Sequence, residues 1–544
     1  MANRRKGINV YDYVVVGAGS AGCVLAARLT EDPGVSVALV EAGPPDTAPE
    51  IHIPAAFPAL FKTRWDWDFD SEPEPELGAR RVYLPRGKML GGSSSMNSMV
   101  YMRGNAADYD SWAAGGARGW GYRDVLPYFI RSEDNERGAD PYHGVGGPLH
   151  VSDSRANSPV VDAYLEAAVQ AGHVHNADFN GAAQTGVGRH QLTQYNGMRW
   201  STADAFLRPA LDRENLTVIT GALAHRVVFN GQRATGVQIS SADPGGETQV
   251  IHADREVIVS AGAYGSPQLL LLSGVGPAAD LGPIGIPVVA DLPVGHGLQD
   301  HPLSPVNYLT DEDSLITAMS PANLSLMREA GVGPLTCNID EGGGFTQTRP
   351  VWAARTSSST AVPSCTSARA WAYRGRVDGM VIAVSLMSPQ SRGQVSLRSA
   401  APDAAPRIFH NYLHAEDDRR SMVAGLRAAL ENAGQPARRK VITGPFDVPA
   451  SGSDADLLAH ARRTIGTQFH GTATCAIGSV VDSGLNVFGL DDFARGRRLD
   501  HAYPDPGKPQ RPDHHDRGEG SRPHQGRPAL PPLPIRPKAS AARG

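Results

Sequence analysis

Three glycines near the start of the chain have the spacing that holds a pyrophosphate. Gly17, Gly19 and Gly22 form the pattern GxGxxG, directly after an apolar run that suits a strand buried on both faces. The first glycine allows a tight turn, the second lets phosphates approach the backbone, and the third lets the next helix pack closely on the strand. We expect that helix over Ala21–Thr30, beginning beside Ser20, with its N-terminus facing the phosphates.

An acidic residue completes this predicted βαβ unit. A second strand is expected over Val35–Val40, and Glu41 ends it, nineteen residues after Gly22. A carboxylate there accepts hydrogen bonds from an adenosine ribose and disfavours a 2'-phosphate. An isolated glycine turn is common, but here strand, helix, second strand and acid all agree. The pattern predicts a dinucleotide site and leaves NAD and FAD as alternatives.

A second glycine-rich loop lies between Arg86 and Trp112. Its consecutive glycines and serines precede an apolar run, Met96–Met102, that is compatible with a helix. Such a loop can direct backbone amides at a flat polar group such as a cofactor ring. The alternative is a flexible linker, although linkers of this composition rarely lie between apolar residues.

The composition is that of a large globular protein. With 544 residues, 41% of them hydrophobic, the chain can form a large core and is expected to make two domains. The net charge of -5 argues against a nucleic-acid partner. Four cysteines lie far apart without CxxC spacing, so neither a disulfide framework nor a metal site is indicated, and a reducing cytoplasm fits.

Two further expectations concern exposure. No apolar stretch of signal or membrane length precedes the glycine turn, so we expect a soluble protein without an integral membrane segment. The proline-rich stretch after Glu41 leads to an aromatic and acidic patch, Trp65–Glu76, and is expected to run over the surface.

Several motifs resemble those of one enzyme family. The stretch Gly87–Asp110 resembles the first signature of the glucose-methanol-choline (GMC) family of FAD-dependent oxidoreductases, and Gly262–Gly276 resembles the second. The resemblance covers most of the chain up to about Phe493. It continues in four shorter segments: Asn196–Leu207, Arg213–Phe229, Leu292–Pro302 and Ser388–Leu397.

The resemblance implies an α/β fold with a discontinuous, Rossmann-like FAD-binding domain interleaved with an α+β substrate domain. We expect the first over residues 8–305 and the second over 306–494. Short β-rich runs at Thr217–Ile219, Arg226–Phe229 and Val257–Ser260 agree, because strands that return after an interval complete a sheet from distant segments.

The resemblance also implies which residues hold the FAD. It puts Asn97 and its neighbours near the isoalloxazine, and the backbone of Ala224 near the adenine. Some relatives attach FAD covalently through a histidine at the position of Met96, and because a thioether cannot form that bond, we predict noncovalent FAD. The expected cofactor-binding residues are Gly17, Gly19, Ser20, Gly22, Glu41, Gly87, Leu90, Gly92, Asn97, Val100 and Ala224.

The resemblance assigns the chemistry to a late histidine. The segment Thr467–Leu490 resembles the one that carries the family's catalytic histidine, at the position of His470. Oxidation of an alcohol requires removal of the hydroxyl proton while a hydride leaves the carbon for flavin N5, and an imidazole titrates near neutral pH. The expected partner is a small-molecule alcohol. Neither its identity nor the electron acceptor can be read from the sequence.

The C-terminus departs from the family pattern. The family has a second catalytic group, His or Asn, and then a helix that covers the flavin, whereas the chain after Arg495 has many prolines and no apolar period. Codons for Arg495–Gln525 read one base later permit the family's residues in order. Those for Gly507–Arg511 then give Gly-Asn-Pro-Asn. We infer a frameshift that replaced a catalytic asparagine and left an unstructured tail over 495–544.

A second stretch, Arg349–Arg376, is also poor in apolar pattern where the family has a strand. Codons for Ser357–Thr366 read two bases later permit QFHCGAVMY, and the original frame resumes near Val377. Three interpretations therefore remain: an FAD-dependent alcohol dehydrogenase or oxidase, a hydroxynitrile-lyase-like enzyme that keeps FAD without redox use, and an inactive, frame-damaged remnant.

Overall fold

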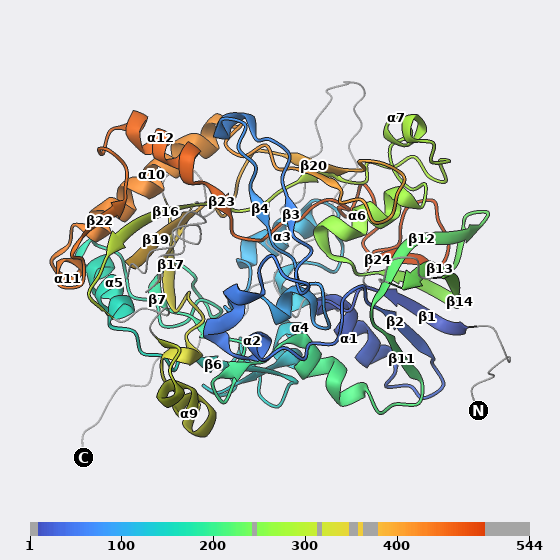
Figure 1. The fold of residues 1–544 in the computed structure, drawn as a ribbon, viewed down its shortest axis with the longest axis horizontal. Coiled ribbons are helices and arrows are strands. Elements are labelled where there is room, and N and C mark those ends of the chain that lie inside the picture. The colour runs from blue at the N-terminus through green and yellow to red at the C-terminus, as the bar shows by residue number, and fades with distance from the viewer. Residues whose placement is uncertain (1–8, 242–246, 313–317, 348–356, 363–378, 496–544) are drawn as a thin grey trace, which may run out of the picture. The chain divides into compact units, whose positions relative to one another are not determined.

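The computed structural model describes residues 9–241, 247–312, 318–347, 357–362 and 379–495. A seven-stranded mixed sheet is built around the N-terminal βαβ unit, and its strands come from distant parts of the chain, as predicted (Figure 1). In order across the sheet they are β11 (Leu216–Ile219), β2 (Val37–Val40), β1 (Val10–Val16), β14 (Thr248–Val259), β13 (Arg233–Ser241) and β12 (Ala222–Asn230), with β24 (Phe493–Arg495) beside β14.

The central strands of this sheet are parallel. Val16, at the end of β1, is level with Val40 of β2 and Val259 of β14, so the carboxyl ends of these strands meet at one edge. The strands are fully buried here because their residues are almost all aliphatic. Helix α1 (Ser20–Leu29) packs against β1 and β2, within one residue of its predicted start and end. α6 (Gly262–Leu272) packs against β12.

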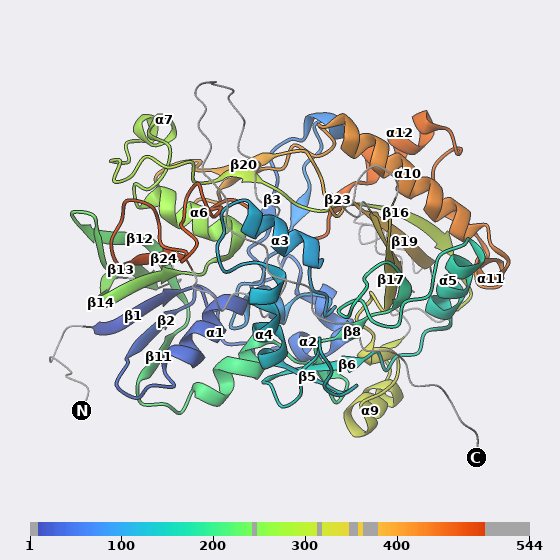
Figure 2. The same cartoon turned by 180° about the vertical axis from the view of Figure 1, so that it is seen from behind.

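A second seven-stranded sheet is formed by later segments and is covered by α5 (Pro159–Gln170), α10 (Glu416–Ala433) and α12 (Asp454–Thr464), as Figures 1 and 2 show. Its apolar core includes residues of β16, β19 and α10. In order, its strands are β22 (Gly444–Asp447), β16 (Pro302–Leu309), β19 (Gly379–Ser385), β18 (Ser357–Val362), β17 (Gly342–Thr346) and β7 (Gly186–Arg189), with β23 (Gly466–Thr467) beside β16.

The remaining elements are short. Among the described residues, the other α-helices are α2 (Pro49–His52), α3 (Ala106–Ala114), α4 (Tyr122–Ser132), α7 (Ala278–Leu281), α9 (Pro321–Ala330) and α11 (Pro436–Arg439). Small sheets contain β3 (Phe69–Asp70) and β4 (Tyr83–Leu84); β5 (Glu133–Asn135), β6 (Leu149–Asp153) and β8 (Gln191–Leu192); β9 (Gln194–Tyr195) and β10 (Met198–Arg199); and β15 (His296–Leu298), β20 (Gly393–Ser396) and β21 (Arg407–Phe409).

Two expectations about local structure need correction. The patch Trp65–Glu76 lies only partly on the surface: Asp68 and Asp70 are exposed, but Asp66 and Glu74 are buried, and their carboxylates accept backbone N–H groups of neighbouring segments. The run Met96–Met102 forms no helix. A single 3₁₀ turn, Gly92–Ser95, precedes irregular chain that buries Met99 and Tyr101 instead.

The two aberrant stretches fall largely outside the described residues. The C-terminal tail from 496 onward lies outside them, as do 348–356 and 363–378. Between those last two ranges, β18 pairs with β17 and β19, so a strand occupies the position where one was expected.

Candidate functional site

The predicted nucleotide turn has the geometry that its glycines require. Gly17 has φ +96°, and a Cβ there would lie 2.6 Å from the carbonyl oxygen of Ser260. A Cβ on Gly22 would lie 1.9 Å from the carbonyl oxygen of Gly17, so only glycine permits this helix to pack so closely on the strand. Helix α1 begins at Ser20, and its N-cap residue is Gly19. Because glycine has no side chain, Gly19 makes no side-chain hydrogen bond to the N–H groups of the first turn.

Glu41 lies beside this turn at the end of β2 and is buried. Its carboxylate accepts the N–H groups of Ala18 and Gly43, both at 2.8 Å. Burial raises the pKa of Glu41 to about 7, against the opposing effect of these hydrogen bonds. The backbone N–H of Ala222 donates to the carbonyl of Glu41, so the first residues of β12, including Ala224, start beside this acid.

The second glycine loop touches the first. The N–H of Gly91 donates to the carbonyl of Ala18 at 2.8 Å, and that of Leu90 donates to the carbonyl of Pro44. Gly92 has φ +53°, and a Cβ on it would lie 2.7 Å from the Cα of Gly19. The two loops therefore form a cradle of bare backbone that fits a dinucleotide, because side chains at these positions would fill it.

Asn97 is fixed by a buried arginine that the sequence analysis did not single out. Its Oδ1 accepts hydrogen bonds from the N–H of Met99 and from Nη1 of Arg199, at 3.1 and 2.8 Å. Arg199 also donates hydrogen bonds to the backbone carbonyls of Ser94 and Ile51, and so ties the glycine-rich loop to the α2 segment. With its oxygen held inward, half-buried Asn97 keeps its amide nitrogen as a donor.

His470 is brought to another histidine, His301, by backbone pairing. Gln299 and Thr472 exchange N–H···O hydrogen bonds of 2.9 and 3.1 Å, and the two Nδ1 atoms of the histidines lie 3.0 Å apart. His301 is buried, whereas the side chain of His470 is exposed. Although part of its surface is exposed, His470 is closely surrounded by protein atoms, whose desolvating effect lowers its pKa, as does the charge of Arg86; the charges of Asp300 and Asp340 oppose this.

Arg86 connects this histidine pair to the second glycine loop. Its Nη1 donates to the carbonyl of Phe469 at 2.6 Å, next to His470, and its guanidinium lies over the ring of Tyr264. The following residue, Gly87, donates its N–H to Oγ of Ser93 within the loop. Although more than 370 residues separate them in sequence, the loop and the His470 segment are therefore in contact.

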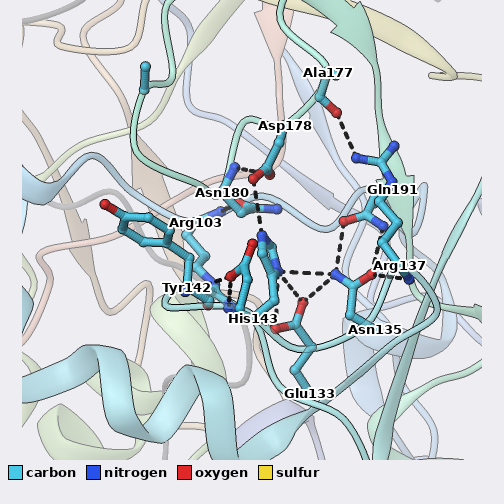
Figure 3. Close-up of polar contacts among 12 residues, drawn as sticks. Arg103, Glu133, Asn135, Arg137, Tyr142, His143, Ala177, Asp178, Asn180 and Gln191 are labelled. Carbon is cyan, nitrogen blue, oxygen red and sulfur yellow. Dashed lines mark hydrogen bonds and ion pairs between the residues drawn. The ribbon is translucent and has the colours of Figure 1, made fainter. Parts of the chain in front are cut away.

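A buried charged network braces the end of the glycine-loop segment (Figure 3). Arg103 donates to Glu133 at 2.8 Å, and both side chains are almost completely buried. His143 lies between Glu133 and Asp178, with its Nδ1 3.0 Å from the first and its Nε2 3.2 Å from the second. Arg103 and Asn180 are also joined, through the backbone N–H of Arg103.

Most of these supporting residues could not be predicted from the sequence. Asp300 and His301 lie in a segment, Leu292–Pro302, that was recognised only for its resemblance, and Arg199 lies in another such segment. The signal in the sequence that could have indicated them is a charged residue inside a segment that resembles the family. Among the described residues, no helix is long and apolar enough to span a membrane, and no group of three or more His, Cys, Asp or Glu side chains could hold a metal.

The glycine cradle, Glu41 and the sheet edge that carries them define a dinucleotide-binding protein. Two models of the GMC oxidoreductase family match residues 11–303 and 389–493. The chain belongs to this family, and it is an FAD-dependent oxidoreductase.

Similar proteins include an uncharacterized GMC-type oxidoreductase of Mycobacterium tuberculosis, 42% identical over 88% of this chain and 92% of that protein. An oxygen-dependent choline dehydrogenase of Brucella anthropi (39%) and an alcohol dehydrogenase [acceptor] of Pseudomonas putida (38%) each match over 88% of this chain and 89% of their own.

Among solved structures, pyridoxine 4-oxidase of Mesorbium loti is 28% identical with a TM-score of 0.81, over 92% of this chain and 96% of that one. A variant of Aspergillus oryzae formate oxidase, described for its FAD modification, is 26% identical with a TM-score of 0.83. The match covers 90% of this chain and 93% of that one. The predicted α/β fold and the FAD cofactor are therefore confirmed.

Proposed function

We propose that this chain oxidises the CH–OH group of a small-molecule alcohol, with His470 as the general base. The names of two relatives, a choline dehydrogenase and an alcohol dehydrogenase, support an alcohol as the donor. The observation that carries the role of His470 is the 3.0 Å contact between its Nδ1 and the Nδ1 of His301, which leaves Nε2 for substrate.

Only one proton fits between two facing Nδ1 atoms. Burial and the charge of His470 lower the pKa of His301 to about 3, so His301 is neutral at physiological pH. The backbone carbonyl of Met387 is a hydrogen-bond partner of His301, and we therefore assign the proton of His301 to Nε2 and an acceptor lone pair to its Nδ1. His470 then donates from Nδ1 and has an unprotonated Nε2, the state that a general base needs.

When bound, FAD supplies a hydride acceptor at flavin N5. Removal of the hydroxyl proton by His470 leaves an electron pair on the alcohol oxygen, which forms the carbonyl bond as the carbon loses its hydride. The charge on His470 after proton transfer lies near the carboxylates of Asp300 and Asp340, both of which favour it.

Three further proposals concern the attachment of FAD, the division into domains and the C-terminus. We propose that FAD is held noncovalently, because Met96 offers no nitrogen for a covalent bond, and that FAD and substrate domains divide near residue 305. We also propose that the chain as printed is impaired, because its tail lacks the second catalytic group. The match to the family's C-terminal model supports this, since it stops at residue 493, two residues before the inferred frameshift.

An anaerobic alcohol panel tests the function. The chain as printed and a frame-restored version are loaded with FAD and mixed with primary and secondary alcohols, and flavin bleaching is followed. We expect the restored protein to bleach, His470→Gln to slow bleaching by about 10²-fold or more, and the surface variant His296→Gln to behave as the parent. Flavin that stays oxidised with every alcohol refutes the proposal, and cleavage of a cyanohydrin by that oxidised protein would indicate a lyase instead.

A further inference from the structure

The carboxylate next to His301 makes four short contacts at the candidate site. Oδ1 of Asp300 accepts the backbone N–H groups of His301 and His470, both at 2.9 Å. Its Oδ2 accepts the hydroxyls of Tyr412 and Thr467, both at 2.5 Å. The residue is buried, and these donors come from three separate segments of the chain.

We infer that Asp300 is the positioning residue of this site: its carboxylate holds the backbones of both histidines and supplies the negative charge that an imidazolium at His470 needs. The inference rests on the proposed role of His470 and adds a residue that acts on it without touching substrate. One carboxylate oxygen fixes the two histidines relative to each other, and the other oxygen anchors the pair to the second sheet through Thr467, which is in β23.

The carboxylate is ionised in this setting. Burial would raise the pKa of Asp300, but His410, which becomes charged in the acid range where Asp300 itself titrates, lowers it, as do the hydroxyls of Thr467 and Tyr412 and the charge of Arg86. His410 lies 3.7 Å from Oδ2, and burial lowers its own pKa to about 4, so it is neutral near pH 7. Arg86 is then the positive group that opposes protonation of His470, while Asp300 and Asp340 favour it.

A role in positioning is distinguishable from a role in folding. Asp300→Asn keeps the shape of the side chain and one acceptor oxygen, and both hydroxyls can rotate to accept its amide, so the variant removes charge more than geometry. Asp418→Asn is the matched control. Asp418 is another buried carboxylate, which accepts hydrogen bonds from the backbone of Gln390 and from the backbone and hydroxyl of Ser391.

The test uses diethyl pyrocarbonate, which modifies the neutral imidazole, on the FAD-loaded full chain. Peptide mass spectrometry gives the modification rate of His470 between pH 5 and 8. We expect the midpoint of this profile to fall by about one pH unit in Asp300→Asn and to stay unchanged in Asp418→Asn. An unchanged midpoint in folded Asp300→Asn overturns the inference.

A second variant decides the matter if Asp300→Asn does not fold. Tyr412→Phe keeps the charge and removes one donor, so amide hydrogen exchange of residues 467–474 should accelerate several-fold, with no change in α5. Exchange that stays at the parent rate overturns the positioning role. Neither measurement requires alcohol oxidation. A chain that oxidises no alcohol would therefore refute the proposed function, while the modification and exchange data would still decide whether Asp300 positions the two histidines.

Discussion

Replacing His143 by glutamine should destabilise the protein in a pH-dependent way. His143 is 6% exposed and lies between the carboxylates of Glu133 and Asp178 (Figure 3). Burial alone would lower its pKa, but the hydrogen bonds and charges of Asp178 and Glu133 outweigh burial and raise the pKa to about 9. Glutamine can keep one of the hydrogen bonds but carries no charge.

The size of the effect follows from the shift. The pKa of His143 rises from 6.5 in the unfolded chain to about 9 in the folded one, and at about 1.4 kcal/mol per unit this stabilises the fold by about 3 kcal/mol. Because the folded pKa is the higher one, this contribution is fully present below pH 6.5 and is lost as the pH rises through 9. Arg103 also neutralises Glu133, so we expect a loss of about 2–3 kcal/mol in His143→Gln at pH 6.

The assay is urea unfolding at pH 6.0, 8.0 and 9.5, followed by tryptophan fluorescence with saturating FAD. The difference between parent and His143→Gln should be largest at pH 6.0 and nearly vanish at pH 9.5. His150→Gln is the control: His150 pairs with Asp134 at 2.7 Å but is more exposed, and its loss should cost less than about 1 kcal/mol. A His143→Gln deficit that is equal at pH 6.0 and 9.5 would show that the charge is not what stabilises this network.

Two more predictions concern the cofactor. Gly92→Ala should reduce FAD occupancy sharply, because its Cβ would lie 2.7 Å from the Cα of Gly19. The control is Gly78→Ala: Gly78 has φ +66° but nothing lies within 4 Å of the new Cβ, so this variant should lose only about 1 kcal/mol of stability through backbone strain. Equal FAD content in both variants would contradict the cradle. Acid precipitation should release all flavin into the supernatant, since Met96 cannot form a covalent link, and yellow precipitated protein would contradict this.

Local pattern was enough to predict the nucleotide-binding half of the fold. The βαβ unit is contiguous, so GxGxxG and Glu41 could be read with their spacing, and the helix and strand bounds agree to within a few residues. The acidic patch around Glu74 was misjudged for a physical reason. Its carboxylate is buried because it accepts hydrogen bonds from the N–H groups of His410 and Tyr412. These partners are more than 330 residues away, so the sequence around Glu74 does not indicate them.

The same limit applied to the candidate site. His470 could be proposed only through resemblance, and its contact with His301 joins residues 169 positions apart. Nothing in the spacing of these two histidines indicates a pair. The pairing depends on the backbone hydrogen bonds between Gln299 and Thr472, which only the fold supplies.

The last described strand ends at the sheet edge that carries the nucleotide turn. In β24, Arg495 is level with Val259 of β14, and Val259 is level with Val16 of β1. All three strands run parallel, so the chain leaves β24 at the same sheet edge where Gly17 begins the nucleotide turn. Ligands of such sheets bind outside the carboxyl ends of the strands. A reading frame that changes at Arg495 therefore alters the sequence that starts beside the dinucleotide, while Phe493 still packs in the core of the sheet.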